Sequence, residues 1–247
     1  MKTMLITGAS RGIGAATALL AAQHGYAVAV NYLNNKTAAD QVVRKILADG
    51  GIAVAIQADV SQEDEIVRMF AAVDRQLGPL HCLVNNAGIL EPQGKLINLD
   101  SGRLLRMFKA NAIGPILCCK EAIKYMSIKS GGEGGTIVNV SSIASRTGSP
   151  FEYIDYAATK GALDSLTIGL SKEVAEEGIR VNAVRPAFIH TDIHKDGGEP
   201  TRISRLKDSI PLKRGGLAEE VAEAILWLAS EKSSYSTGAF IDVTGGK

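Results

Sequence analysis

Short apolar runs alternate with longer amphipathic segments along the chain. The short runs are apolar on both faces, which is typical of parallel strands covered by helices on each side. They predict strands at 4–7, 27–32, 52–57, 82–85, 136–141, 180–184 and 240–243. The segments between them predict helices at 13–24, 37–49, 63–77, 103–127, 154–177 and 218–229.

A strand followed by a helix, repeated six times and closed by a seventh strand, predicts a doubly wound α/β fold. We expect a seven-stranded, mostly parallel sheet with helices on both faces and right-handed crossovers. Ligands of such folds bind beyond the carboxyl ends of the strands. The loops that follow strands are therefore the places where functional residues are expected.

The composition favours one globular domain over residues 1–247, because 46% of the residues are hydrophobic and only 21% are charged. The net charge of +1 gives no electrostatic case for nucleic acid or an acidic membrane as a partner. We expect neither a signal peptide nor a membrane span, since no apolar stretch is long enough. The cysteines Cys82, Cys118 and Cys119 form no disulfide framework, which suits a reducing cytosol and predicts a cytoplasmic protein.

The loop after the first strand carries three glycines in a G-x-x-x-G-x-G spacing. Glycine lets the backbone turn sharply and approach a ligand closely. The helix that follows directs its free N–H groups and the positive end of its dipole at the loop, so a pyrophosphate is the natural guest. The alternative is a tight turn without a ligand. The candidate phosphate-binding residues are Gly8, Ser10, Arg11, Gly12, Ile13 and Gly14.

The end of the second strand indicates the type of dinucleotide. Folds that prefer NAD usually place an acidic residue there, to bind the ribose 2′-hydroxyl. This chain has Asn31 and no acid. Arg11, with Lys36 as a second candidate, could instead meet a 2′-phosphate. We therefore favour NADP(H), while the neutral Asn31 leaves NAD(H) possible.

Two further loops carry polar residues that suit a dinucleotide. Asp59, followed by Val60 after the third strand, could accept a hydrogen bond from an adenine amino group, or it could cap the next helix. The fourth strand is followed by Asn85, Asn86, Ala87 and Gly88. These four residues could form the floor under a ribose, or only a structural turn.

Tyr156 and Lys160 are four residues apart and lie on one face of a predicted helix. A nearby ammonium lowers the pKa of a phenol, and such a tyrosine can exchange a proton with a carbonyl or alcohol oxygen. Ser142, fourteen residues earlier, could hold the same oxygen. Asn111 falls inside a predicted helix, where an amide is usually exposed; one that disturbs the helix could hold a water near Lys160.

Together these residues resemble the classical short-chain dehydrogenase/reductase family over nearly the whole chain. The matching motifs are TGxxxGxG at 7–14, Asp59, NNAG at 85–88, Asn111, the second serine of VSS at 142, YxxxK at 156–160, RVNAVRP at 180–186 and YSTG at 235–238. The chain is most similar in style to bacterial reductases of the glucose-dehydrogenase and 3-oxoacyl-carrier-protein-reductase type. Two departures are Ala187, where the family usually has glycine after Pro186, and Thr244, where it often has aspartate.

The resemblance implies a Rossmann fold and an oxidoreductase that transfers a hydride between a nicotinamide cofactor and a small carbonyl or secondary alcohol. It implies a tetrad of Asn111, Ser142, Tyr156 and Lys160. It also implies further cofactor contacts from Pro186, Ile189 and Thr191, and a homodimer or homotetramer paired through the long helices. In this reading Tyr156 is the acid/base and Lys160 lowers its pKa. The alternative is a sensor or regulator that binds NADP(H) without turnover.

The segment 190–216 is long, charged and rich in glycine at 197–198, and we expect it to cover the substrate. His190 and His194 are four residues apart, a spacing that metal sites use. No third ligand is suggested, so we predict no metal site. The two histidines are expected either to line the substrate pocket or to face solvent.

Overall fold

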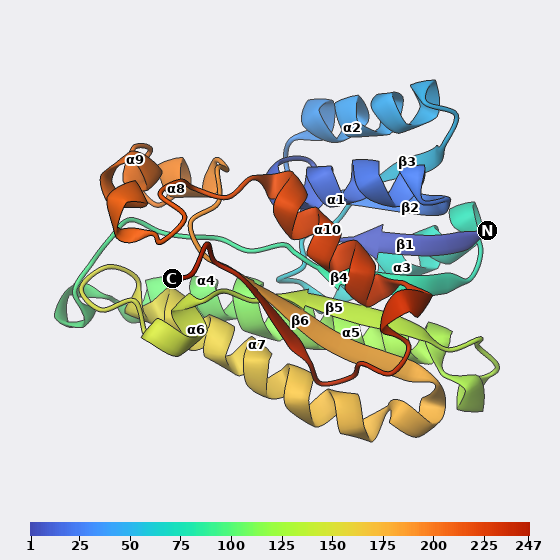
Figure 1. Ribbon diagram of the computed structural model, residues 1–247. Coiled ribbons are helices and arrows are strands. Elements are labelled where there is room, and N and C mark those ends of the chain that lie inside the picture. Colours follow the sequence, from blue (N-terminus) through green and yellow to red (C-terminus); the bar gives the residue numbers. More distant parts are fainter.

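The computed structural model describes residues 1–247. Seven strands form one sheet in the order β3-β2-β1-β4-β5-β6-β7 (Figure 1). Every neighbouring pair is parallel. The bounds are β1 (Lys2–Ile6), β2 (Tyr26–Tyr32), β3 (Ile52–Gln57), β4 (Leu80–Asn85), β5 (Gly135–Val140), β6 (Ile179–Pro186) and β7 (Phe240–Val243). The predicted doubly wound fold is confirmed, and the sheet is entirely parallel.

The helices cover both faces of this sheet. Their bounds are α1 (Gly12–Gln23), α2 (Lys36–Ala48), α3 (Glu63–Leu77), α4 (Ser101–Phe108), α5 (Gly114–Met126), α6 (Ala144–Thr147), α7 (Ile154–Glu173), α8 (Ile193–Asp196), α9 (Arg202–Leu206) and α10 (Ala218–Ala229). Helices α1, α2 and α10 pack into one buried apolar cluster, and α3, α5 and the end of α7 into another. Figure 1 shows these two groups on opposite sides of the strands.

The double cover explains why the strands are apolar on both faces. In β1, Met4 and Ile6 belong to the first cluster, while Leu5 between them belongs to the second. All three cysteines are free and buried. Burial raises the pKa of the Cys119 thiol to about 12, so this thiol behaves as a small apolar side chain.

Two predicted helices differ from those observed. The helix predicted over 103–127 is two helices, α4 and α5, joined by a π-helical turn at Lys109–Ile113. The helix predicted over 154–177 ends at Glu173 and is followed by a 3₁₀ turn at Ala175–Glu177. Hydrophobic periodicity predicts that a segment is helical but is not sensitive to one extra residue within a turn.

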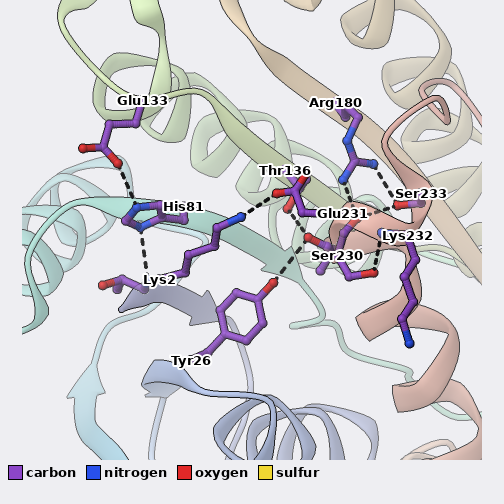
Figure 2. Close-up of polar contacts among 12 residues, drawn as sticks. Lys2, Tyr26, His81, Glu133, Thr136, Arg180, Ser230, Glu231, Lys232 and Ser233 are labelled. Carbon is purple, nitrogen blue, oxygen red and sulfur yellow. Dashed lines mark hydrogen bonds and ion pairs between the residues drawn. The ribbon is translucent and has the colours of Figure 1, made fainter.

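The amino edge of the sheet is held by polar contacts from distant parts of the chain (Figure 2). Arg180, in β6, donates to the carbonyl of Ser230 at 3.0 Å and to the hydroxyl of Ser233 at 3.0 Å. It also donates to the carbonyl of Leu228 near the end of α10, at 3.1 Å. Carbonyls at a helix end have no partner within the helix, so these bonds stabilise that end.

None of the helices combines the length and the apolar character needed to cross a bilayer.

Candidate functional site

A cavity of about 560 Å³ opens at the carboxyl edge of the sheet. All predicted site residues line it except Gly14, Asn85 and Asn111. Asn86 of the NNAG motif and His194 line it too. Further lining residues that the sequence analysis did not assign to a site are Leu33, Asn34, Asn35, Ala58, Ile89, Ala110, Val140, Ser141, Ala187, Asp192 and Ile193. The loops after six strands thus converge on one space, as expected for a doubly wound sheet.

The glycine loop has the backbone geometry of an anion cradle. Gly8 and Gly12 have φ values of +63° and +56°, in the left-handed region that favours glycine. Gly14 lies behind the loop, where an added β-carbon would be 2.5 Å from Nδ2 of Asn86 and 2.7 Å from the carbonyl oxygen of Gly8. No side chain caps the start of α1. Its first N–H groups therefore remain available to a phosphate, and the loop fits a dinucleotide.

The side chain of Asn31 is used inside the protein. Its Oδ1 accepts a hydrogen bond from the Gly8 N–H at 3.0 Å, and its Nδ2 donates to the carbonyl of Ala58 at 3.1 Å. Asn31 is 2% exposed. Its amide therefore braces the glycine loop against the end of β3, and Asn31, predicted as a cofactor-binding residue, also lines the cavity. The next residues, 33–35, line the cavity beyond it.

Arg11 and Lys36, the two candidates for a 2′-phosphate, lie in different settings. Lys36 pairs with Asp40 on the surface of α2 at 2.7 Å and does not line the cavity. Arg11 lines the cavity and pairs with Asp196 of α8, and its guanidinium lies 4.0 Å from Asp192. Of the two candidates, only Arg11 lines the cavity.

The loop after β3 carries Asp59. The carboxylate of Asp59 accepts from the N–H of Ser61 at 2.8 Å, and Gln62, not Asp59, occupies the cap position of α3. Asp59 therefore lies in the region just before α3, where it forms a local turn, and it also lines the cavity.

Asn85, predicted to floor a ribose, does not line the cavity. As the last residue of β4 it points into the interior, where its Nδ2 donates to Oδ1 of Asn139 at 3.0 Å and its Oδ1 has no partner. Asn86 lines the cavity and donates to the carbonyls of Thr7 and Gly8 at 2.8 and 3.0 Å. The two asparagines of the NNAG motif thus differ, because adjacent residues at a strand end point in opposite directions.

Asn111 lies fully buried in the π-helical turn. Its Oδ1 accepts from the Ile89 N–H at 2.8 Å, and its Nδ2 donates to the Ile89 carbonyl at 2.9 Å. A β-carbon on Gly88 would lie 3.3 Å from Oδ1 of Asn111 and 3.8 Å from Nζ of Lys160. Gly88 thus lies beside both side chains, and the turn places Asn111 next to Lys160.

Tyr156, Lys160 and Ser142 meet at the inner end of the cavity. The ammonium of Lys160 donates to the carbonyl of Val140 at 2.8 Å and lies 5.5 Å from the centroid of the Tyr156 ring. Burial raises the pKa of Tyr156 to about 12, and the hydroxyl of Ser142 opposes this rise only in part. Burial also lowers the pKa of Lys160 to about 8, against the charge of Asp164.

These values differ from the expectation that Lys160 lowers the pKa of Tyr156. The physical reason is that protein atoms surround much of both groups, and the reduced hydration disfavours the phenolate and the ammonium alike. The ammonium also lies over the ring and is bonded to a backbone carbonyl.

The segment 190–216, which we call the cover because it is predicted to cover the substrate, lines the cavity only through Thr191, Asp192, Ile193 and His194. Arg202 of α9 pairs with Glu152 and Glu199, and its guanidinium lies 4.9 Å from the ring centroid of Tyr153. The Tyr153 hydroxyl donates to the carbonyl of Gly197 at 3.0 Å. These contacts anchor the cover to the loop before α7.

The two histidines of the cover have different surroundings. His190 is exposed, whereas His194 is 9% exposed and lines the cavity. Nε2 of His194 lies 3.0 Å from the Ile189 carbonyl, which requires this nitrogen to carry the proton, and Nδ1 has no partner. Burial lowers the pKa of His194 and so favours the neutral ring. No three His, Cys, Asp or Glu side chains converge to hold a metal.

A doubly wound parallel sheet with a glycine-rich first loop and a Tyr–Lys pair at the same edge defines the class of nicotinamide-dependent oxidoreductases. A family model described as "Enoyl-(Acyl carrier protein) reductase" matches residues 8–247. The chain belongs to this family of short-chain dehydrogenases/reductases.

Individual relatives agree with that assignment. The chain is 59% identical to an uncharacterized oxidoreductase, YgfF, of Escherichia coli, over 100% of both chains. It is 39% identical to the 3-oxoacyl-[acyl-carrier-protein] reductase FabG of Staphylococcus aureus, over 99% of this chain and 97% of that protein. A solved dehydrogenase/reductase from Sinorhizobium meliloti has a TM-score of 0.92 and 31% identity, over 99% of this chain and 94% of that chain.

Proposed function

We propose that this protein is an NADP(H)-dependent oxidoreductase that interconverts a small-molecule carbonyl and the corresponding secondary alcohol. The observation that carries the proposal is the meeting of Tyr156, Lys160 and Ser142 in the cavity that the glycine loop also lines. A proton-transfer group and a dinucleotide cradle in one cavity suit hydride transfer to or from a carbon that carries an oxygen.

Each residue has a distinct role in this proposal. A bound NADP(H) would supply or accept the hydride at the substrate carbon. The hydroxyl of Ser142 holds the substrate oxygen, where negative charge develops during reduction. Tyr156 gives the proton to that oxygen in reduction and takes it back in oxidation. Lys160 supplies a positive charge beside the ring, and Asn111 holds the loop that packs against Lys160.

The test is the Tyr156→Phe variant, assayed by NADPH oxidation with ketones, diketones, 3-oxoacyl thioesters and sugars. We expect turnover to be lost while NADPH affinity stays near that of the wild type, because the phenol hydroxyl acts on the substrate. Turnover close to wild type in this variant would overturn the role of Tyr156. Tight NADPH binding without turnover of any substrate by the wild type would favour the sensor instead.

The preference for NADP(H) over NAD(H) is supported by Arg11, and by the absence of an acidic side chain among residues 31–35 at the end of β2. Asp192 and Asp196 of the cover lie beside the guanidinium of Arg11 and compete with a 2′-phosphate for it. Comparing NADPH and NADH affinity directly decides this part of the proposal. FabG is named a 3-oxoacyl-[acyl-carrier-protein] reductase. That name puts 3-oxoacyl thioesters in the substrate panel.

The proposed assembly is a homodimer or homotetramer, and the proposed location is the cytoplasm. Ile113, just before α5, is 45% exposed, Ile116 in the first turn of α5 is 43% exposed, and Ile168 of α7 is 45% exposed. Exposed apolar side chains on these two helices support pairing through them. Light scattering of the purified protein measures the assembly.

A further inference from the structure

The end of β5 contacts α7 at three successive turns of the helix. The hydroxyl of Ser142 lowers the pKa of Tyr156 against its burial. The carbonyl of Val140 accepts a hydrogen bond from Lys160 at 2.8 Å, and the hydroxyl of Ser141 donates to Oδ1 of Asp164 at 2.6 Å. The first two contacts belong to the proposed reaction centre. The third involves a carboxylate that the proposed reaction does not use.

Asp164 is a buried carboxylate with all of its partners supplied by the protein. It is 8% exposed. Oδ2 accepts from Nε of Arg185 in β6 at 2.9 Å, and a second guanidinium nitrogen of Arg185 is also 2.9 Å away. Arg185 is itself fixed, since its guanidinium lies 3.7 Å from the ring centroid of Phe240 and 3.6 Å from Asp242 in β7. Asp164 therefore ties α7 to three neighbouring strands.

This carboxylate lies one helical turn after Lys160, on the same face of α7. The groups that face Lys160 are few. From α7 they are Tyr156 and Asp164, and from β5 the carbonyl of Val140. The loop after β4 adds the uncharged Gly88, and the π-helical turn adds the neutral Asn111 beside it. The charge of Arg185 influences Lys160 through the ion pair of Arg185 with Asp164. The one charge that raises the pKa of Lys160 against its burial is Asp164.

We propose that Asp164 is a positioning residue for the Tyr156–Lys160 pair: it fixes α7 on the strand ends and holds a negative charge one helical turn from the buried ammonium of Lys160. The inference rests on the proposed function for its catalytic consequence, but the charge on Lys160 is a property of the protein without substrate. A buried ammonium is costly to hold without an opposite charge nearby. The Asp164–Arg185 pair supplies such a charge on a fixed support.

The experiment measures the pKa of Lys160 directly, by NMR titration of protein labelled with carbon-13 at lysine Cε, with Lys160→Met identifying the resonance. The Asp164→Asn variant should lower this pKa by about one unit, because it removes the neighbouring negative charge but keeps the shape. Arg185→Gln should raise it, because it leaves the carboxylate of Asp164 without its cation. The two opposite shifts cannot both come from loosening of the helix.

Asp155→Asn is the matched control. Asp155 also lies in α7 and forms a buried ion pair, with Arg103 at 2.7 Å, but it does not contribute to the pKa of Lys160. We expect it to lower thermal stability and leave that pKa unchanged. An unchanged pKa in Asp164→Asn, or an equal shift in Asp155→Asn, would overturn the inference. If Asp164→Asn does not fold, the direction of the shift in Arg185→Gln decides alone.

A kinetic measurement tests the catalytic consequence separately. In Asp164→Asn, the alkaline limb of the pH profile of kcat/KM should move toward lower pH, since the ammonium of Lys160 is lost earlier. A wild type without turnover would end the proposed function while the NMR titration still decides the role of Asp164. A normal profile beside a shifted pKa would overturn the catalytic part of the inference.

Discussion

Gly14 offers a sharp test of how the cofactor loop is built, through the Gly14→Ala variant. Gly14 is in the first turn of α1 and has no special φ, so the methyl group alone decides the outcome. That methyl group would lie 2.5 Å from Nδ2 of Asn86, 2.7 Å from the Gly8 carbonyl oxygen and 2.9 Å from Cα of Ala9. Two of these three neighbours are backbone atoms that cannot rotate away.

The size of the effect follows from three contributions. Overpacking against backbone costs about 1–3 kcal/mol. Moving Asn86 aside gives up its hydrogen bonds to Thr7 and Gly8, at about 1 kcal/mol each. The better helix propensity of alanine returns about 1 kcal/mol. We expect a net loss of roughly 2–4 kcal/mol in the free energy of unfolding. The distorted loop should also weaken NADPH binding.

The assay is urea denaturation together with NADPH titration, and Gly169→Ala is the control. Gly169 lies in α7, where an added β-carbon would meet nothing within 4 Å. The same substitution there should raise the free energy of unfolding by about 0.5–1 kcal/mol. If Gly14→Ala were as stable as Gly169→Ala and bound NADPH normally, the close packing behind the loop would be refuted.

Three further variants test other parts of the site. Arg11→Ala should weaken NADPH binding about ten- to a hundred-fold and leave NADH affinity unchanged, since only NADPH has the 2′-phosphate; equal losses in fluorescence titrations would contradict this. Asn111→Leu should lower the free energy of unfolding by about 2–4 kcal/mol, because the buried N–H and C=O of Ile89 lose their partners. An unchanged midpoint of urea denaturation would count against this prediction. The pKa of Lys160 is about 8 in the folded protein and 10.5 in the free side chain. Between these pH values Lys160 is protonated in the unfolded chain but not in the folded protein. The free energy of unfolding of the wild type should therefore rise with pH in this range. Lys160→Met should therefore be more stable relative to wild type at about pH 7 than at about pH 10, and a constant difference in denaturation curves would refute this.

Much of the fold was predictable because the central strands, such as β2, are buried on both faces and are therefore mainly apolar. The predicted boundaries of β3, α3 and α10 are those observed. The predicted helix over 103–127 was wrong in its middle, because the π-helical turn changes local hydrogen bonding without altering the apolar pattern.

The site was predictable as a set of loops but less so as individual contacts. The order of the strands brings every such loop to one edge, which the strand–helix alternation already implies. Asn31 and Asn85 were assigned to the cofactor because of their place in the sequence, yet their amides bond to the interior. Which way an amide at a strand end points depends on its neighbours in space, such as Gly8 and Asn139.

The pKa values of Tyr156 and Lys160 could not be predicted from the sequence either. Spacing gives the distance between two side chains on a helix but not the water that each of them loses. Burial dominates both values here. The four-residue spacing therefore identifies the Tyr156–Lys160 pair but not the protonation state of either side chain.

The π-helical turn at Lys109–Ile113 has a consequence for comparing sequences. A π turn holds one residue more than an α turn, so it acts as an insertion within an otherwise continuous helix. A relative that lacks one residue here would form a straight helix and turn a different side chain toward Ile89. We expect a single-residue gap at 109–113 to mark the loss of the Asn111 site in a relative, even one that retains the tyrosine and the lysine.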